Sequence, residues 1–268
     1  MNNRLYMLES VEDTICNSFI ITTESGKVIS VDGGHRAQSE YLLNTMREIT
    51  KSGKPHIDAW ILTHPHADHI QALFDIVENY PDEIEIDRIY LNFPSQLCFE
   101  GSDEDGVESM ELFYSALPKI SDRLRILSGG DKLKIGEAEI TVLYSQDFEI
   151  KGCNNSSLVF RVDLAGKSIL FTGDCGEEAG NKILRLWKDS GILNCDIVTM
   201  SHHGQQGVSR EFYEAVSPEI CLWPTPSWLW TNCDGTGNFT TLETRKWIEE
   251  LGVKENYIMK DGAHMIEL

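Results

Sequence analysis

Short apolar runs and amphipathic stretches alternate along this chain in an order that occurs twice. Strand-like runs come in pairs around a glycine turn, at 18–22 with 27–31 and at 158–162 with 167–171, and each pair predicts a β-hairpin. Apolar residues at helical spacing follow the hairpins. The pattern therefore predicts hairpins first and alternating strands and helices afterwards, once in each half of the chain.

The spacing also predicts the remaining elements. The polar stretch 92–108 is expected to be a solvated insertion. Further strands are expected at 57–62, 86–91, 124–127, 133–135, 138–143, 195–200 and 220–223, with short strands in 256–268, and helices at 39–51, 70–77, 109–120, 177–190, 209–216 and 241–251.

These elements predict one α/β domain over residues 1–268. No linker rich in proline, glycine or serine divides the chain. Each half supplies strands for a mixed sheet, and amphipathic helices can cover it; in 241–251 the inward residues are Leu242, Trp247, Ile248 and Leu251. We therefore expect two mixed β-sheets packed face to face with helices outside.

Composition narrows the range of functions. The chain has 268 residues and a formal charge of −20, so its surface repels polyanions and long nucleic acid is a disfavoured partner. A small-molecule or short substrate is expected instead. No run approaches the roughly eighteen apolar residues of a membrane helix, and no apolar signal core follows the N-terminus, which predicts a cytoplasmic protein without a membrane partner. The 7 cysteines contain no CxxC pair and are interpreted as reduced core residues.

The stretch 63–69, Thr-His-Pro-His-Ala-Asp-His, directly follows the apolar run 59–62 and holds three of the 8 histidines. Alternate residues of a strand point to the same side, so His64 and His66 can face one ion, and Asp68 and His69 on the following turn a second. Imidazole and carboxylate ligands suit Zn²⁺ first, and Mn²⁺, Fe or Ni²⁺ less well. Two such ions are a hydrolytic arrangement.

Two later stretches repeat this pattern of an apolar strand followed at once by a metal-competent residue: 171–174, Phe-Thr-Gly-Asp, and 200–204, Met-Ser-His-His-Gly. Together with the histidine motif and Asp-Gly-Gly at 32–34, they resemble the metallo-β-lactamase-fold superfamily in order and spacing, from about residue 15 to 220. More narrowly, Asn-Asn-Ser-Ser-Leu-Val at 154–159 is similar to the metallo-β-lactamase-like domain of bacterial competence DNA-uptake channel proteins.

The resemblance implies a four-layer αββα sandwich with a binuclear metal site at one edge. It assigns zinc as the first choice of metal, with one or two ions. The implied ligands are His64 and His66 for the first ion, Asp68, His69 and His203 for the second, and Asp174 as a bridge between them.

One family feature is missing from the sequence. Most relatives place a further histidine between the first motif and the bridging aspartate, but no histidine occurs between His69 and His202. The segment that would supply it contains Cys153, Asn154 and Asn155. An asparagine amide is a weak ligand, so Asn154 or Asn155 would hold the metal loosely or hydrogen-bond the water or the substrate, and Cys153 is a softer alternative that we rank lower.

The resemblance implies a metal-dependent hydrolase of a phosphodiester or of a small ester, lactone or amide. Asp68 would orient the attacking water and take its proton, and His202 would protonate the leaving group or bind substrate. The alternative for His202 is a structural residue behind the ligands. The alternative function is a binding or sensing module with a degenerate metal site, which the missing histidine favours.

The stretch 222–239 is rich in aromatic residues, among them Trp223, Trp228, Trp230 and Phe239. It follows the last ligand motif closely, so we interpret it as a lid that packs over the pocket mouth and selects the substrate. The alternative is a loop cluster that covers the edge of a sheet.

Overall fold

A computed structural model describes residues 1–95, 104–232 and 239–268 of the chain. The strands are β1 (Arg4–Met7), β2 (Ser18–Thr22), β3 (Val28–Asp32), β4 (His56–Ile57), β5 (Ala59–Ile61), β6 (Glu85–Ile86), β7 (Ile89–Leu91), β8 (Leu124–Ile126), β9 (Lys132–Ile135), β10 (Ala138–Tyr144), β11 (Val159–Leu164), β12 (Lys167–Phe171), β13 (Ile197–Thr199), β14 (Ile220–Trp223), β15 (Glu255–Ile258) and β16 (His264–Glu267). The α-helices are α1 (Ser39–Thr50), α2 (Ala67–Asn79), α3 (Glu104–Ile120), α4 (Glu177–Trp187), α5 (Arg210–Val216), α6 (Ser227–Thr231) and α7 (Thr241–Glu250).

The strands form two large mixed sheets of seven strands each. The first has the order β16-β1-β2-β3-β5-β7-β8, and the second β15-β14-β13-β12-β11-β10-β9. In each sheet the hairpin strands pair antiparallel and the strands that alternate with helices pair parallel. The expected twofold repetition of hairpins followed by alternation is therefore confirmed.

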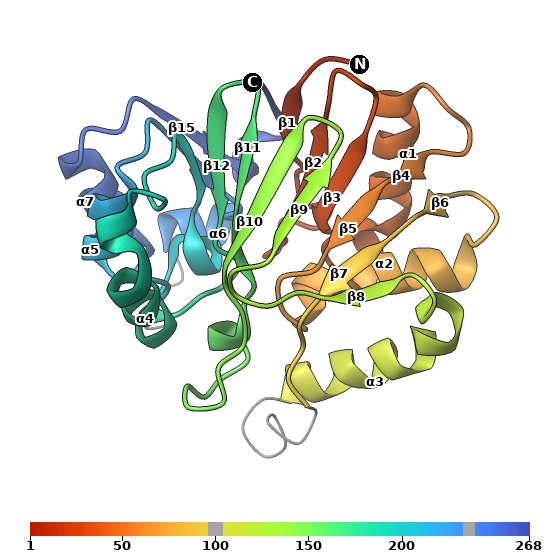
Figure 1. The fold of residues 1–268 in the computed structure, drawn as a ribbon, viewed down its shortest axis with the longest axis horizontal. Helices are drawn as coiled ribbons and strands as arrows, with labels where there is room; N and C mark the ends of the chain where they lie inside the picture. Colours follow the sequence, from red (N-terminus) through yellow and green to blue (C-terminus); the bar gives the residue numbers. More distant parts are fainter. Residues whose placement is uncertain (96–103, 233–238) are drawn as a thin grey trace.

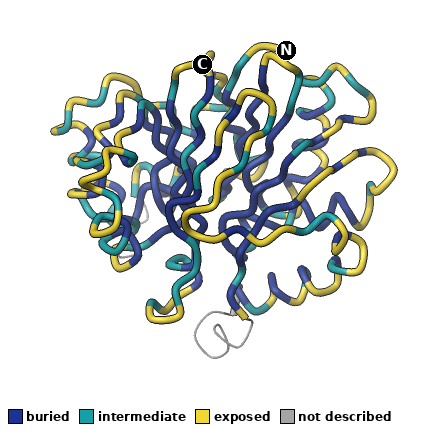
Figure 2. Tube along the Cα trace, viewed as in Figure 1, coloured by how far each residue is buried: buried dark blue, intermediate teal, exposed yellow. Residues whose placement is uncertain are grey.

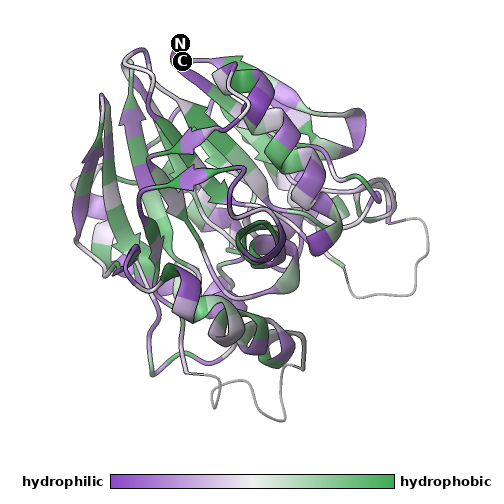
Figure 3. Cartoon of the chain, turned by 90° about the vertical axis from the view of Figure 1, so that its right-hand side faces the viewer, coloured by the Kyte–Doolittle hydropathy of each residue, from purple (hydrophilic) through white to green (hydrophobic). Residues whose placement is uncertain are grey.

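The two sheets lie face to face between two layers of helices. Helices α1, α2 and α3 cover the first sheet, and α4, α5 and α7 cover the second (Figure 1). The central strands of both sheets are buried along most of their length, whereas the edge strands β8, β9, β15 and β16, the outer faces of the helices and the loops are partly exposed (Figure 2). Apolar residues accordingly concentrate on the strands (Figure 3). The fold is the predicted αββα sandwich.

The space between the sheets is filled by apolar side chains of both. Phe19 of the first sheet meets Phe171 of the second edge to face, with ring centroids 5.5 Å apart, and Phe160 stacks on Phe171 at 5.0 Å. Each of these rings is almost fully buried, which contributes roughly 1.5–3 kcal/mol per side chain. This core holds the two sheets, and the loops at their edge, in a fixed relation.

Two predicted strands are interrupted. The stretch 57–62 divides into β4 and β5, and 86–91 into β6 and β7, with β4 and β6 forming a separate two-stranded sheet. Asp58 lies at the first interruption, where its carboxylate accepts hydrogen bonds from Lys27 Nζ at 2.8 Å and from the Val28 amide at 2.9 Å. The Asp58 carboxylate thus takes the Val28 amide, which would otherwise donate to the backbone of a continuous strand. The backbone pairing between the strands is therefore interrupted at this point.

Two helices begin earlier than predicted. Helix α2 starts at Ala67, so Asp68 and His69 lie in its first turn and not on a preceding turn. Helix α3 starts at Glu104, so the end of the expected polar insertion is helical, while 96–103 fall outside the described residues.

The sequence predicts that Leu242 faces inward from α7, but this residue is 51% exposed, so this part of the prediction is wrong. The buried positions of this helix are Thr241, Thr244 and Ile248, one residue out of phase with Leu242.

The five described cysteines, Cys16, Cys153, Cys175, Cys195 and Cys221, are buried and form no disulfide among the described residues. Within the three described ranges, no helix combines the length and the apolar character needed to cross a bilayer.

Candidate metal centre

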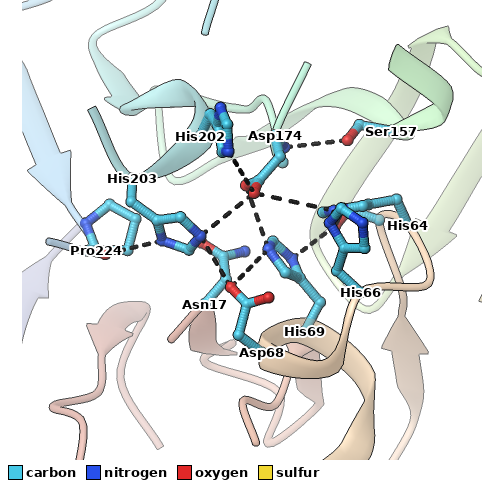
Figure 4. Close-up of polar contacts among 12 residues, drawn as sticks. Asn17, His64, His66, Asp68, His69, Ser157, Asp174, His202, His203 and Pro224 are labelled. Atoms are coloured by element: carbon cyan, nitrogen blue, oxygen red, sulfur yellow. Dashed lines mark hydrogen bonds and ion pairs between the residues drawn. The ribbon is translucent and has the colours of Figure 1, made fainter. Parts of the chain in front are cut away.

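Three strand ends from both sheets meet at one edge of the sandwich. Chain segments leaving β5, β12 and β13 carry His64, Asp174 and His203 to this edge, and α2 adds Asp68 and His69. A hydrogen bond of 2.8 Å from the Leu158 amide to the carbonyl of Thr63 ties the second half of the chain to the histidine motif. The side chains predicted from three distant motifs therefore point toward one another (Figure 4).

Asp68, His69, Asp174 and His203 each offer one ligand atom to a buried group whose atoms all lie within 4.8 Å of one another. His69 Nε2 lies 3.3 Å from Asp68 Oδ2 and 3.2 Å from Asp174 Oδ1. His203 Nε2 lies 2.9 Å from Asp68 Oδ2 and 3.3 Å from Asp174 Oδ2. Ligand atoms around a tetrahedral zinc ion are about 3.3 Å apart. The spacing of these four residues is therefore that of a metal coordination shell.

The atoms at the centre of this group support the same interpretation. Asp68 Oδ2, His69 Nε2, Asp174 Oδ1 and His203 Nε2 are buried and face one another at the distances given above, but none of them forms a hydrogen bond of good geometry among the described residues. Leaving such atoms unsatisfied in a protein interior costs free energy, and each would be satisfied by a cation at the centre. The residues present fit a divalent metal ion.

Asp32, at the end of β3, orients the ring of His69 from behind. Its Oδ2 accepts a hydrogen bond from His69 Nδ1 at 2.8 Å, which directs Nε2 toward the centre. The carboxylate is held in turn by Asn17 Nδ2 at 2.6 Å, Thr63 Oγ1 at 2.8 Å and the Thr63 amide at 2.8 Å. Asp-Gly-Gly at 32–34 is part of the motif pattern of the sequence, but that pattern predicts no role for Asp32, although an acidic residue that ends an apolar strand was the available signal.

His203 is oriented by the backbone of the segment after β14. Its Nδ1 donates a hydrogen bond of 2.9 Å to the carbonyl of Pro224, which leaves Nε2 facing Asp68 and Asp174. His203 has a positive φ of 55°, and the following Gly204 one of 82°. A Cβ at Gly204 would come within 2.6 Å of the Trp223 ring, so the turn that presents His203 requires glycine.

The charges in this group are opposed and buried. Burial favours the neutral acid, but the rings of His69 and His203 outweigh it and hold the pKa of Asp68 well below its usual range; the same two rings lower the pKa of Asp174. Burial likewise disfavours a charged His203, yet Asp174 and Asp68 raise its pKa to about 10. The two carboxylates therefore stay ionised inside the protein and are compensated by the two ring charges, whose place a bound cation would take.

His64, His66 and Cys153 form a second candidate group beside the first, again with one ligand atom each within 4.8 Å. His64 Nε2 and His66 Nδ1 are 3.0 Å apart. Asp174 Oδ2 lies 3.9 Å from His64 Nε2, so this carboxylate contacts both groups, as expected of a bridge. We call the group of His64, His66 and Cys153 the first cluster, and that of Asp68, His69, Asp174 and His203 the second cluster.

His202 and Asn154 lie together at the rim of the site. Asn154 Nδ2 is 3.2 Å from His202 Nε2, and that nitrogen is 3.9 Å from Asp174 Oδ2. Burial lowers the pKa of His202, which stays 19% exposed at its side chain. Asn155 is directed elsewhere and donates from Nδ2 to the carbonyl of Lys151 at 2.9 Å. Asn154 is thus the asparagine that reaches the predicted catalytic histidine.

The aromatic residues of the stretch 222–239 lie in two places, the core behind the second sheet and a separate contact between Trp228 and Phe239. Trp223 is 1% exposed and packs edge to face against Trp230 at 5.2 Å, in the core behind the second sheet. The Arg245 guanidinium lies over Trp230 at 4.0 Å. The prediction that these two rings cover the site is therefore wrong, because both rings pack against helix α7 instead. Trp228 contacts Phe239 at 5.5 Å, and 233–238 of the predicted lid fall outside the described residues.

Comparison with known proteins gives one family and several structural relatives. The family described as the metallo-beta-lactamase superfamily matches residues 11–219. ComE operon protein 3 of Bacillus subtilis (strain 168) is 25% identical over 175 residues, which cover 65% of this chain and 20% of that protein. The match thus spans about a fifth of the length of this relative.

Among solved structures, the metallo-beta-lactamase fold protein YhfI from Bacillus subtilis is similar over 98% of this chain and 99% of its own, with 14% identity and a TM-score of 0.57. CmlA, a diiron β-hydroxylase from Streptomyces venezuelae, is similar over 100% of this chain and 54% of its own, with 13% identity and a TM-score of 0.61. At these identities the likeness concerns the fold alone.

Proposed function

The chain belongs to the metallo-β-lactamase superfamily, and from that premise we propose that it is a metal-dependent hydrolase. Its substrate would be a phosphodiester or a small ester, lactone or amide. The observation that carries the proposal is the second cluster: four buried ligand atoms that form no hydrogen bond of good geometry among the described residues surround one point, and Asp174 extends from it to His64.

Under this proposal Asp68, His69, Asp174 and His203 would hold one ion, and His64 and His66 would hold another, with Asp174 within reach of both. Histidine nitrogens with carboxylate oxygens favour Zn²⁺, with Mn²⁺, Fe and Ni²⁺ as alternatives. Such ions, when bound, supply an activated water and polarise an oxygen of the substrate.

The side chains of this protein would orient the reactants and move the proton. The Asp68 carboxylate lies in the second cluster among the proposed ligands, where it can orient a water and take the proton that the water loses. His202 stands at the rim on the side of Asp174, where it can bind the substrate or protonate the leaving group. Asn154, 3.2 Å from His202 Nε2, restrains that ring.

The surface charge bears on the size of the substrate. A formal charge of −20 repels long polyanions, so a polynucleotide would approach against an unfavourable field. A short or small phosphodiester carries little charge and would be attracted locally by bound cations. The narrower resemblance to the domain of competence DNA-uptake proteins favours phosphodiesters, and the surface charge limits them to short ones, so we place small phosphodiesters first among the candidate substrates.

The test is metal-dependent turnover of generic substrates. The protein is stripped with a chelator, reloaded with Zn²⁺, Mn²⁺ or Fe²⁺, and assayed with bis(p-nitrophenyl) phosphate, p-nitrophenyl acetate, a simple lactone and a simple amide, with Asp68→Ala as the matched control. We expect turnover of at least one substrate by the loaded protein and none by the variant. Bound metal without turnover of any substrate would contradict the proposal and favour the binding or sensing module.

A further inference from the structure

We propose that Cys153 is a thiolate ligand of the first metal ion, so that two imidazoles, one sulfur and the shared carboxylate of Asp174 would hold this ion. The inference rests on the proposed function only in assuming that the centre binds metal. It changes the expected ligand set of the first cluster, because the asparagines that follow Cys153 in the sequence are no longer needed as ligands.

The geometry of the first cluster is that of a shared coordination site. Cys153 Sγ and one ring nitrogen each of His64 and His66 lie within 4.8 Å of one another. The 3.0 Å between His64 Nε2 and His66 Nδ1 is close to the roughly 3.3 Å expected for two nitrogens on one tetrahedral zinc ion. Cys153 is 2% exposed and His64 fully buried, so the sulfur faces the imidazoles inside the protein and not in solvent.

The backbone holds Cys153 in this position from two sides. Its carbonyl accepts hydrogen bonds from the Ser156 amide at 2.9 Å and from Ser156 Oγ at 2.6 Å, which closes a short 3₁₀ turn over Asn154–Ser156. Two residues after that turn, the Leu158 amide binds the carbonyl of Thr63, directly before His64. The sulfur is therefore anchored to the same strand end that carries the histidines.

The other described cysteines are placed differently. Cys175 is adjacent to Asp174 in sequence, but its Sγ contacts the carbonyl of Gly176 at 3.6 Å and belongs to neither cluster. Cys16, Cys195 and Cys221 lie in the apolar core, as Cys153 also does, but they belong to neither cluster. Among the described cysteines, only Cys153 shares a group of ligand atoms with histidines. This selectivity argues against a cysteine that merely fills space.

A thiolate would give the first cluster a different preference from the second. Sulfur is a soft ligand and favours Zn²⁺ or Co²⁺ over Mn²⁺, whereas the second cluster offers only nitrogen and oxygen. On binding, Cys153 would form a metal–sulfur bond and release its thiol proton to solvent. The two clusters would then differ in metal selectivity as well as in position.

Cobalt substitution tests this assignment, because a thiolate bound to Co²⁺ gives a near-ultraviolet charge-transfer band that nitrogen and oxygen ligands do not. The full chain is loaded with Co²⁺, the bound metal is counted, and the spectrum is recorded for the wild type, Cys153→Ser, Cys153→His and the matched control Cys175→Ser. Circular dichroism establishes that each variant is folded.

We expect two Co²⁺ per chain and the thiolate band in the wild type and in Cys175→Ser. Cys153→Ser should lose the band and one Co²⁺, whereas Cys153→His should lose the band but keep both ions, because imidazole replaces the thiolate. Two ions without the band in the wild type, or the band retained in Cys153→Ser, would overturn the assignment and leave the proposed hydrolase intact. The band without turnover of any substrate would support the ligand and refute the hydrolase, and failure to bind Co²⁺ at all would overturn both.

Discussion

The two clusters share one edge of the sandwich but are supported in different ways. In the second cluster each ring is tied from behind, His69 by the Asp32 carboxylate and His203 by the Pro224 carbonyl. In the first cluster both histidines come from one short loop: His64 Nδ1 lies 3.2 Å from the neutral hydroxyl of Thr63, where His69 has a carboxylate, and His66 is partly exposed. Ligands fixed by outer hydrogen bonds bind metal more tightly. We therefore expect the second cluster to keep its ion under conditions that empty the first.

Removal of the shared carboxylate should have the largest effect. Asp174 lies within 3.9 Å of a histidine in each cluster, so Asp174→Ala should weaken both ions and reduce turnover by at least about 10³-fold as the activated water is lost. Elemental analysis after gel filtration and steady-state rates measure the two effects. Retention of two ions per chain would contradict the bridging position.

Variants in one cluster should separate it from the other. Asp68→Ala should remove the second ion and abolish hydrolysis, since Asp68 is both a proposed ligand and the proposed proton acceptor. His66→Ala should remove only the first ion. Metal counts of about one per chain are expected for each variant, with unchanged circular dichroism. Full residual activity in Asp68→Ala would refute its assigned role.

Substitution of the rim histidine should leave both clusters loaded. His202→Gln is expected to lower kcat by about 10²-fold, because general acid–base groups contribute on that order, without changing the metal content. His264→Gln is the matched control, since His264 Nε2 donates to the carbonyl of Ile258 at 2.9 Å and His264 belongs to no candidate metal group among the described residues. A loss of metal in His202→Gln would contradict the proposed role in proton transfer and show that His202 holds the metal ligands in position.

Weakening the support behind His69 should have the smallest and most selective effect. Asp32→Asn keeps the size of the side chain but removes its negative charge, and loss of such a partner typically costs about 10- to 100-fold in metal affinity. Competition with a chelator measures the affinity of each ion. Asp196→Asn is the control, because Asp196 accepts bonds from Ser168 within the second sheet. An equal loss in both clusters would remove the proposed difference between them.

Much of the fold followed from local patterns. Period-two apolar runs around Gly26 and Gly166 predicted hairpins that the structure contains, because a hairpin is encoded within about a dozen neighbouring residues. The predictions failed where a tertiary contact decided the outcome. Asp58 ends a strand by binding a distant amide, and α7 buries Thr241 and Thr244 in place of Leu242, according to how the helix meets its sheet.

The amino-acid sequence by itself determined the repeated order of hairpins and alternating elements and the three strand-end motifs, because each is a matter of spacing between near neighbours. Only the tertiary structure decided which side chains support the centre. Asp32 lies 37 residues from His69, and Pro224 is 21 residues from His203. Cys153 reaches His64 and His66 through the packing of one half of the chain on the other. Such contacts depend on sheet register and on the direction of each side chain, which spacing along the chain does not specify.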